Sequence, residues 1–179
     1  MRVDVSWDQV LSAFELVKDD PNFAASHARV AEGKMPSEMM QAIALRPEIL
    51  QTMASLGGSV FPGGILERSL QEAVILESSR LNACQFCTNA HIYNMRTLGI
   101  AADPIAYIDN QESLPKREQL ALAYTRAAMQ DSNRIPDSLF AELKEEFSDP
   151  EIVQLTFLIG LINLLNLFNN CLQITYPTQ

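Results

Sequence analysis

The residues best suited to chemistry lie between Glu72 and His91, in the sequence EAVILESSRLNACQFCTNAH. This stretch holds two thiols three positions apart, Cys84 and Cys87, with the imidazole four positions after the second thiol and the carboxylate twelve positions before the first. A thiolate is a nucleophile, a second thiol can close a disulfide with it, and an imidazole oriented by a carboxylate can move the proton. The residue types and their spacing therefore predict thiol redox chemistry.

The two thiols and the imidazole are expected on one helix, from Cys84 to Leu98, where residues three and seven positions apart share a face. The start of a helix favours a thiolate through the helix dipole. This effect favours Cys84, which is nearer to the helix end, whereas a hydrogen bond to His91 favours Cys87. The residues alone leave open which sulfur attacks.

The carboxylate is expected on the preceding helix, from Ile65 to Leu81. Asn82 is a good N-cap for the second helix, so the chain can fold back here as an antiparallel hairpin. In such a hairpin Glu72 and His91 come level with each other, because each residue adds about 1.5 Å along a helix. Glu77 is the other acid of this helix, and it lies on a different face. We therefore expect Glu72 to orient His91.

Helical periodicity dominates the whole sequence, and strand alternation is nearly absent. The spacing Ser6-x-x-Gln9 predicts a capping box at the first helix, and GGSVFPGG at 57–64 predicts a loop. The helical segments cover about 6–18, 22–31, 36–45, 47–56, 65–81, 84–98, 102–108, 115–130, 136–147 and 149–172. The sequence thus predicts an all-α bundle of about nine helices in one domain over residues 1–179, with residues 1–34 as an N-terminal helical extension.

The chain of 179 residues carries a net charge of −9, from 13 Lys and Arg against 22 Asp and Glu. It has no cluster of basic residues, so nucleic acid and anionic membranes are poor candidates for partners. The first residues, MRVDVSWDQV, lack the apolar core of a signal peptide. We therefore expect a cytoplasmic protein, in which a C-x-x-C pair is more often catalytic or metal-binding than a structural disulfide.

The most apolar segment is IVQLTFLIGLINLLNLF, from Ile152 to Phe168. It contains four polar residues and falls short of the roughly 20 mostly apolar residues that a membrane span needs. We expect a buried core helix or a subunit interface. The asparagines near its end are expected to serve packing rather than catalysis, Cys171 to be a packed thiol and His27 to lie at the surface. These asparagines are Asn163, Asn166, Asn169 and Asn170.

At the thiol motif the sequence resembles the alkylhydroperoxidase AhpD-like branch of the carboxymuconolactone decarboxylase family. The signature of that branch, E-x11-C-x-x-C-x3-H, is matched by Glu72, Cys84, Cys87 and His91. The flanking sequences RPEILQTM, GGILERSLQEAV, LPKREQLALAYTRAA and LINLLNLFNN are also similar, so the resemblance covers about Met35 to Ile174. It implies an AhpD-like helical bundle that assembles as a homo-oligomer, as a trimer or a hexamer.

The resemblance also implies a peroxidase reaction. Cys87 would attack a hydroperoxide and become a sulfenic acid, Cys84 would resolve it to a disulfide, and Glu72 and His91 would relay the proton. No bound cofactor is implied, because the redox-active Cys84–Cys87 disulfide would be reduced by an external dithiol or a lipoyl-type reductant protein. Phe86 stands where the best-known peroxidase members carry a second histidine, so this chain has one proton-transfer group fewer.

Two alternatives remain open from the sequence. The first keeps the thiol pair but not the peroxidase reaction, as in a disulfide oxidoreductase or a redox sensor. The second is a metal site formed by the two thiols, His91 and Glu72. Against the metal site, three ligands on one helix crowd one side of the ion, whereas structural zinc sites usually draw ligands from separate segments.

Overall fold

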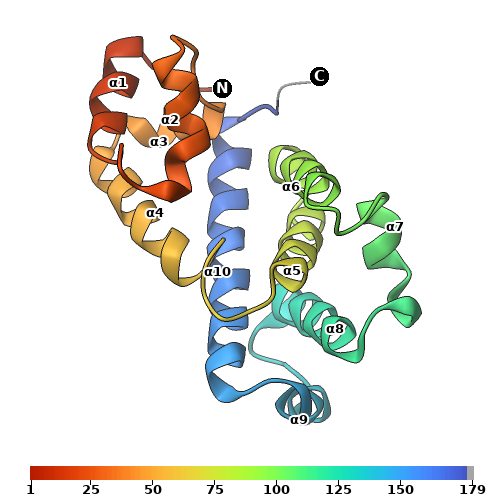
Figure 1. Ribbon diagram of the computed structural model, residues 1–179. Coiled ribbons are helices and arrows are strands. Elements are labelled where there is room, and N and C mark those ends of the chain that lie inside the picture. The colour runs from red at the N-terminus through yellow and green to blue at the C-terminus, as the bar shows by residue number, and fades with distance from the viewer. Residues whose placement is uncertain (177–179) are drawn as a thin grey trace. The chain divides into compact units, whose positions relative to one another are not determined.

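The computed structural model describes residues 1–176, and within them the chain is entirely helical, without a strand (Figure 1). The predicted all-α class is therefore confirmed. The described chain divides into two compact units, one made of Met1–Gly64 with the C-terminal segment from Asn169, the other of Ile65–Phe168. The boundary at Gly64 lies well beyond the predicted extension of residues 1–34. The assignment of residues 1–179 to a single domain stays a prediction.

Four α-helices and a short 3₁₀-helix make up most of the first unit. They are α1 (Trp7–Glu15), η1 (Pro21–Phe23), α2 (Ala24–Ala31), α3 (Glu38–Ala44) and α4 (Pro47–Ser59). The predicted capping box is present, with the Ser6 and Gln9 side chains each bonded to the other's backbone. Phe14 and Phe23 are buried and meet edge to face, with ring centroids 6.3 Å apart. The helix α4 continues into the predicted glycine-rich loop and ends at Ser59.

The second unit is built around α5, the helix that carries Glu72. Its elements are α5 (Arg68–Leu81), α6 (Gln85–Thr97), α7 (Pro104–Asp109), η2 (Gln111–Ser113), α8 (Lys116–Asp131), α9 (Asp137–Glu146) and α10 (Asp149–Leu172), which passes into the first unit after Phe168. Helices α6, α7 and α8 all pack against α5, and every residue of α5 from Leu70 to Ser79 is buried. The core of this unit combines Ala73, Leu76, Met95, Ile108, Leu114 and Leu122.

Helix α10 alone among the described helices is long and apolar enough to cross a membrane, judged by length and composition. This is weak evidence for a span, because the core helices of globular proteins pass the same test. Within the second unit the polar Gln154 of α10 is buried, and its Oε1 accepts the backbone N–H groups of Ile65 at 2.7 Å and Leu66 at 3.3 Å. This contact fixes the start of the segment that leads into α5.

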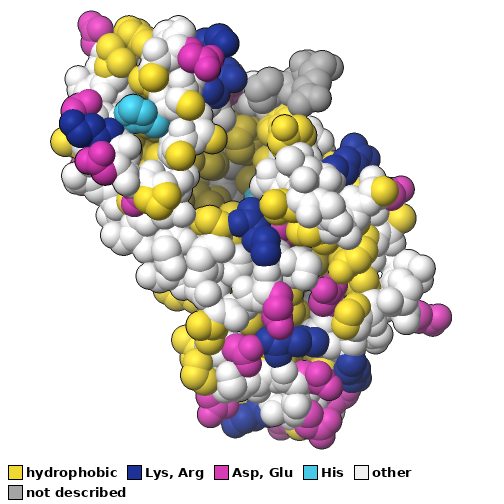
Figure 2. Space-filling view, viewed as in Figure 1, with side chains coloured by type: hydrophobic (Ala, Val, Ile, Leu, Met, Phe, Trp, Pro, Cys, Tyr) yellow, Lys and Arg dark blue, Asp and Glu magenta, His cyan; other side chains and the backbone are white. Residues whose placement is uncertain are grey.

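Charged side chains of both signs mix on the surface of the second unit around α9, as Figure 2 shows. Lys116 pairs with Glu142 at 2.8 Å, and Arg117 pairs with Glu67 at 3.0 Å and also with Glu151. These pairs place part of the acidic excess of the chain beside basic groups. Exposed pairs of this kind add little stability, typically up to about 1 kcal/mol each.

Candidate active site

The connection between α5 and α6 is only three residues long and sets the position of the thiol pair. Helix α5 ends in a Schellman motif, in which the Cys84 N–H donates to the Ser79 carbonyl at 2.9 Å and the Ala83 N–H donates to the Arg80 carbonyl at 3.0 Å. Ala83 takes the left-handed conformation that this motif requires, with φ +50°. The motif turns the chain back, so that α6 runs along α5.

Cys84 ends this connection and begins the next helix. It is the N-cap of α6, and its Sγ accepts the backbone N–H of Cys87 at 3.4 Å. The predicted N-cap, Asn82, was therefore wrong by two positions, because Asn82 is the C-cap of α5. The predicted helix start at Cys84 was wrong by one position, because α6 begins at Gln85. An N–H donor and the positive end of a helix dipole both stabilise negative charge on the Cys84 sulfur.

The asparagines of α10 hold the connection in place. The Asn82 side-chain amide donates to Asn163 Oδ1 at 2.9 Å and to Asn166 Oδ1 at 3.0 Å. The buried Asn166 in turn donates to Ser79 Oγ at 3.2 Å. This amide cluster satisfies polar groups that would otherwise be costly to bury. The predicted packing role is confirmed for Asn163 and Asn166.

The predicted contact between Glu72 and His91 is present, and it crosses from α5 to α6. His91 Nδ1 lies 2.5 Å from Glu72 Oε2. The Glu72 side chain is completely buried, and that of His91 is 12% exposed. Since an ionised carboxylate can only accept hydrogen bonds, Nδ1 carries the proton and donates it to Glu72. The Nε2 nitrogen is then the basic atom of the neutral ring.

Arg68, a residue that sequence reasoning did not single out, holds the other oxygen of Glu72. Its Nε and Nη2 donate to Oε1 at 2.9 Å and 2.6 Å. Burial raises the pKa of the Glu72 carboxyl, but the hydrogen bond and charge of His91, together with Arg68, outweigh burial and lower that pKa below its ordinary value. The four-residue spacing of Arg68 and Glu72 on a helix was the signal that could have found this pair.

The two motif thiols are buried, with Cys84 0% and Cys87 6% exposed. Both are present as thiols. Cys171 is exposed, so the prediction that it is a packed thiol was wrong. His27 of the first unit is half-buried rather than at the open surface.

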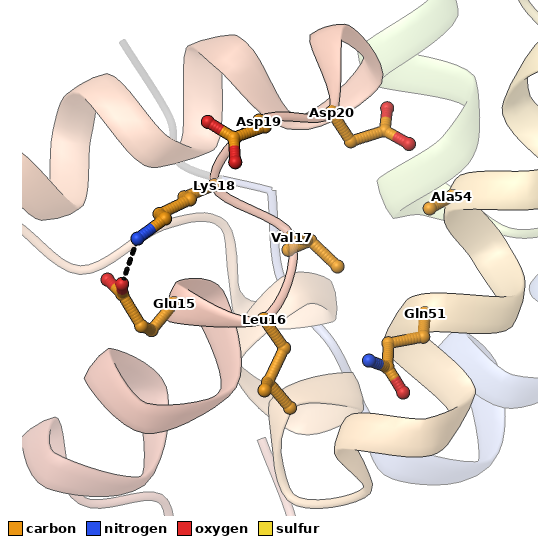
Figure 3. Close-up of a pocket in the computed structure, with 8 residues that line it drawn as sticks. All are labelled: Glu15, Leu16, Val17, Lys18, Asp19, Asp20, Gln51 and Ala54. Atoms are coloured by element: carbon orange, nitrogen blue, oxygen red, sulfur yellow. Dashed lines mark hydrogen bonds and ion pairs between the residues drawn. The ribbon is translucent and has the colours of Figure 1, made fainter.

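Other polar features of the described residues offer less for chemistry. Among residues 1–176 no three His, Cys, Asp or Glu side chains are grouped so that they could hold a metal ion, so the geometry lends no support to the alternative of a metal site. The first unit has a hollow of about 290 Å³. Lys18 pairs with Glu15 there, and Asp19 and Gln51 also line it (Figure 3). It contains neither a thiol nor an imidazole.

The fold and the site define a class: helical proteins with a thiol pair at the start of a helix and a carboxylate–imidazole pair on the same hairpin. Residues 47–128 match the model of the carboxymuconolactone decarboxylase family. This region includes the complete α5–α6 hairpin and therefore all four residues of the motif. This match and the solved neighbours support an assignment to this family, and the chain has the AhpD-like fold.

Individual relatives are distant in sequence and close in structure. YdfG of Bacillus subtilis (strain 168), an uncharacterized protein, is 25% identical over 105 residues, which make up 56% of this chain and 71% of that protein. A solved protein of unknown function from Agrobacterium tumefaciens, with a suggested role as the antioxidant defence protein AhpD, is 27% identical. That match covers 77% of this chain and 97% of the other, with a TM-score of 0.68.

Two further solved structures show how far the fold extends. A peroxidase-related protein from Ralstonia eutropha JMP134 with an alkylhydroperoxidase AhpD core is 17% identical, over 98% of this chain and 92% of that one, with a TM-score of 0.75. A variant of the debrominase Bmp8 in complex with 2,3,4-tribromopyrrole is 15% identical, over 93% of this chain and 88% of that one, with a TM-score of 0.76. At these identities the matches show the fold alone.

Proposed function

We propose that the protein is a thiol-dependent hydroperoxide reductase. The family and its neighbours suggest an enzyme with an antioxidant or peroxidase-related role. The observation that carries the finer proposal is the 2.5 Å contact between Glu72 and His91 on the hairpin that also bears both thiols. An oriented imidazole one helical turn from a thiol pair is the arrangement that nucleophilic thiol chemistry needs.

The proposed cycle starts with removal of the Cys87 proton by His91 Nε2. The thiolate attacks the outer oxygen of the hydroperoxide, the O–O bond breaks, and the alkoxide takes the proton from His91 to leave as an alcohol. Cys87 is now a sulfenic acid, and the Cys84 sulfur attacks it to form the disulfide and release water. An external dithiol, such as a lipoyl-type reductant protein, reduces the disulfide and restores both thiols.

The assignment of the attacking sulfur rests on two opposing influences. Cys87 is buried but slightly less so than Cys84, at 6% against 0% exposed, and it lies one helical turn before His91. Both facts favour it as the sulfur that meets the peroxide. Cys84 accepts the Cys87 N–H at the helix start, which favours negative charge on its sulfur. A sulfur on which negative charge is stabilised is also a good leaving group, which suits Cys84 when the disulfide is reduced. We assign the attack to Cys87 and the resolution to Cys84.

A count of free thiols tests the function. One equivalent of cumene hydroperoxide should remove two thiols per chain and leave Cys171 reduced, and dihydrolipoamide should then support many turnovers. Loss of two thiols without turnover would instead identify a redox sensor or a disulfide oxidoreductase of another specificity. Unchanged thiols would eliminate the peroxidase proposal.

Trapping of the sulfenic acid tests the order of the two sulfurs. In a Cys171→Ser background, Cys84→Ser should accumulate a sulfenic acid on Cys87 that dimedone traps and mass spectrometry detects. Cys87→Ser should consume no peroxide above the uncatalysed rate. Dimedone labelling of Cys84 in the Cys87→Ser variant, at the wild-type rate, would reverse the assignment.

The proposal extends to the assembly and to the cell compartment. We expect a homo-oligomer, a trimer or a hexamer, acting on hydroperoxides in the cytoplasm without nucleic acid or membrane partners. Sedimentation velocity of the full chain measures the assembly directly. A monomer at micromolar concentration would contradict this part of the proposal and leave the thiol chemistry unaffected.

A further inference from the structure

Arg68 lies between the solvent and the buried carboxylate of Glu72. Its side chain is 38% exposed, while that of Glu72 is completely buried. Both hydrogen bonds from the guanidinium go to Oε1, at 2.9 Å and 2.6 Å, and the other oxygen accepts from His91. Each oxygen of the Glu72 carboxylate therefore has its own partner, and the carboxylate cannot rotate without breaking a charge-assisted hydrogen bond.

The place of Arg68 in its helix is poor for helix stability. It is the first residue of α5, where the positive end of the helix dipole repels a cation. A basic residue four positions before an acidic one is also the weaker order for an ion pair along a helix. The stability of α5 does not account for an arginine at this position. Its contact with Glu72 offers another explanation.

Arg68 acts on Glu72 through its positive charge. A buried carboxylate without a counter-charge strongly favours a proton on its imidazole partner, because the imidazolium neutralises it. An imidazolium cannot accept a proton from a thiol. With Arg68 in contact, the carboxylate is already balanced, and the imidazole can remain neutral.

We propose that Arg68 is a positioning residue, which fixes the Glu72 carboxylate and balances its charge so that His91 acts as a neutral base toward the thiol pair. This inference rests on the proposed function for its catalytic meaning. The protonation claim can be measured without any peroxide.

The other charged groups on the elements packed against α5 have partners of their own. On α8, Glu118 accepts from Tyr107 of α7 at 2.5 Å and from Ser69 at 3.4 Å. The remaining partnered groups are Arg117 with Glu67 and Glu151, Arg126 with Glu77, Asp109 with Arg80, and Arg96 with the Ala102 carbonyl. On α6 the other titratable residues are Cys87, Tyr93 and Arg96, with Cys84 as the N-cap.

The test uses the pH dependence of thiol alkylation in the full chain. In a Cys171→Ser background, the rate with iodoacetamide is measured from pH 5 to pH 10 for wild type, Arg68→Met and Arg68→Lys. We expect the midpoint of the profile to fall by about one pH unit in Arg68→Met, because His91 then keeps its proton to higher pH and an imidazolium near a thiol stabilises the thiolate. A neighbouring opposite charge typically shifts a titration by about 1–3 units. Arg68→Lys keeps the charge and should restore most of the wild-type profile.

Arg126→Met is the matched control. It removes the arginine that pairs with Glu77, the other buried acid of α5, at a similar 2.5 Å distance and with a similarly exposed side chain. Its alkylation midpoint should equal that of wild type. A thermal melt of each variant confirms that the compared proteins are folded, and Arg68→Lys covers the case in which Arg68→Met is not.

Proton NMR supplies a second reading of the same claim. The chain has two histidines, so His27→Gln leaves a single C2–H signal, that of His91. This signal should titrate at higher pH in Arg68→Met than in the parent, while the alkylation midpoint moves to lower pH.

Unchanged alkylation and NMR midpoints in folded Arg68→Met would overturn the inference and reduce Arg68 to an ordinary ion pair. That result is separable from failure of the proposed function. If the wild type turns over no peroxide but the midpoints shift as expected, Arg68 has the inferred role and the peroxidase proposal falls.

Discussion

Two buried glutamates of α5, Glu72 and Glu77, form a natural comparison. Both lie in the buried stretch of the helix, and each accepts a hydrogen bond from an arginine Nε, at 2.9 Å from Arg68 and at 2.5 Å from Arg126. Residues five positions apart on a helix point about 140° away from each other. Glu72 therefore faces α6, and Glu77 faces α8.

The second partner of each glutamate separates their roles. Glu72 contacts a histidine, whose proton can leave near neutral pH. Glu77 has a second arginine, Arg80, at 3.8 Å, and an arginine keeps its proton in proteins. Two glutamates of one helix thus have different partners, a histidine on one face and a pair of permanently charged arginines on the other. A buried carboxylate therefore points to acid–base catalysis only where the side chain that it contacts can gain or lose a proton.

The largest expected effect comes from removing the charge of Glu72. Glu72→Gln keeps the shape of the side chain but can no longer orient and stabilise the protonated imidazole. We expect peroxide-dependent oxidation of the thiol pair to slow by about 10²-fold, within the range for lost acid–base catalysis. Stopped-flow measurement with cumene hydroperoxide gives the rate, and Glu77→Gln is the isosteric control on the same helix. Equal oxidation rates in Glu72→Gln and Glu77→Gln would contradict the different roles assigned to the two glutamates.

The converse effect is expected for Glu77→Gln. Loss of this carboxylate leaves Arg126 and Arg80 without their shared counter-ion. Their side chains are 31% and 34% exposed, so water replaces part of the lost interaction. The free energy of unfolding should fall by about 1–2 kcal/mol, with the thiol oxidation rate within about twofold of wild type. Urea denaturation at pH 7 measures the first quantity. A loss of rate without a loss of stability would place Glu77 in the relay.

The sequence predicts that Glu72 and Glu77 lie on different faces of α5, because the direction of a side chain on a helix depends only on its position along the chain. The positions of Glu72, Glu77 and His91 follow from counting residues along two helices, and the count needs only the approximate place of the turn. An error of two residues at that turn moved the N-cap from Asn82 to Cys84 and still left Glu72 level with His91. The residue types and their spacing therefore predict the contact between Glu72 and His91 even when the predicted helix boundary is wrong.

The details that escaped prediction depend on contacts between elements far apart in the sequence. The cap at Cys84 arises from a Schellman motif with alanine at a position where glycine is usual, so no glycine marks it. The anchoring of Asn82 comes from Asn163 and Asn166, more than 80 residues away. The exposure of Cys171 is likewise set by tertiary packing, about which its apolar neighbours in sequence say little.

Acid stability sharpens the comparison further. Burial raises the pKa of the Glu72 carboxyl, but His91 and Arg68 lower it by more, so its folded-state pKa lies below the ordinary 4.5. A depressed pKa stabilises the fold above the unfolded value, and this stability is lost as the pH falls below about 4.5 toward the folded value. The free energy of unfolding should thus fall less between pH 5 and pH 3 in Glu72→Gln than in wild type. Parallel curves from urea titrations would show that Glu72 is not linked to folding.

The smallest expected effect concerns the connection that brings α6 over the Glu72 face. Ala83 holds φ +50°, a conformation that costs an alanine free energy and a glycine almost none. Ala83→Gly relieves this cost but gives the unfolded chain more freedom, so the net gain in stability should be about 0.5–1 kcal/mol. The Cys84 cap and the Glu72–His91 contact should survive, because the Schellman hydrogen bonds use backbone atoms. A melting temperature raised by a few degrees with an unchanged alkylation profile is the expected result. A lower melting temperature would mean that the alanine methyl group contributes packing that outweighs its backbone strain.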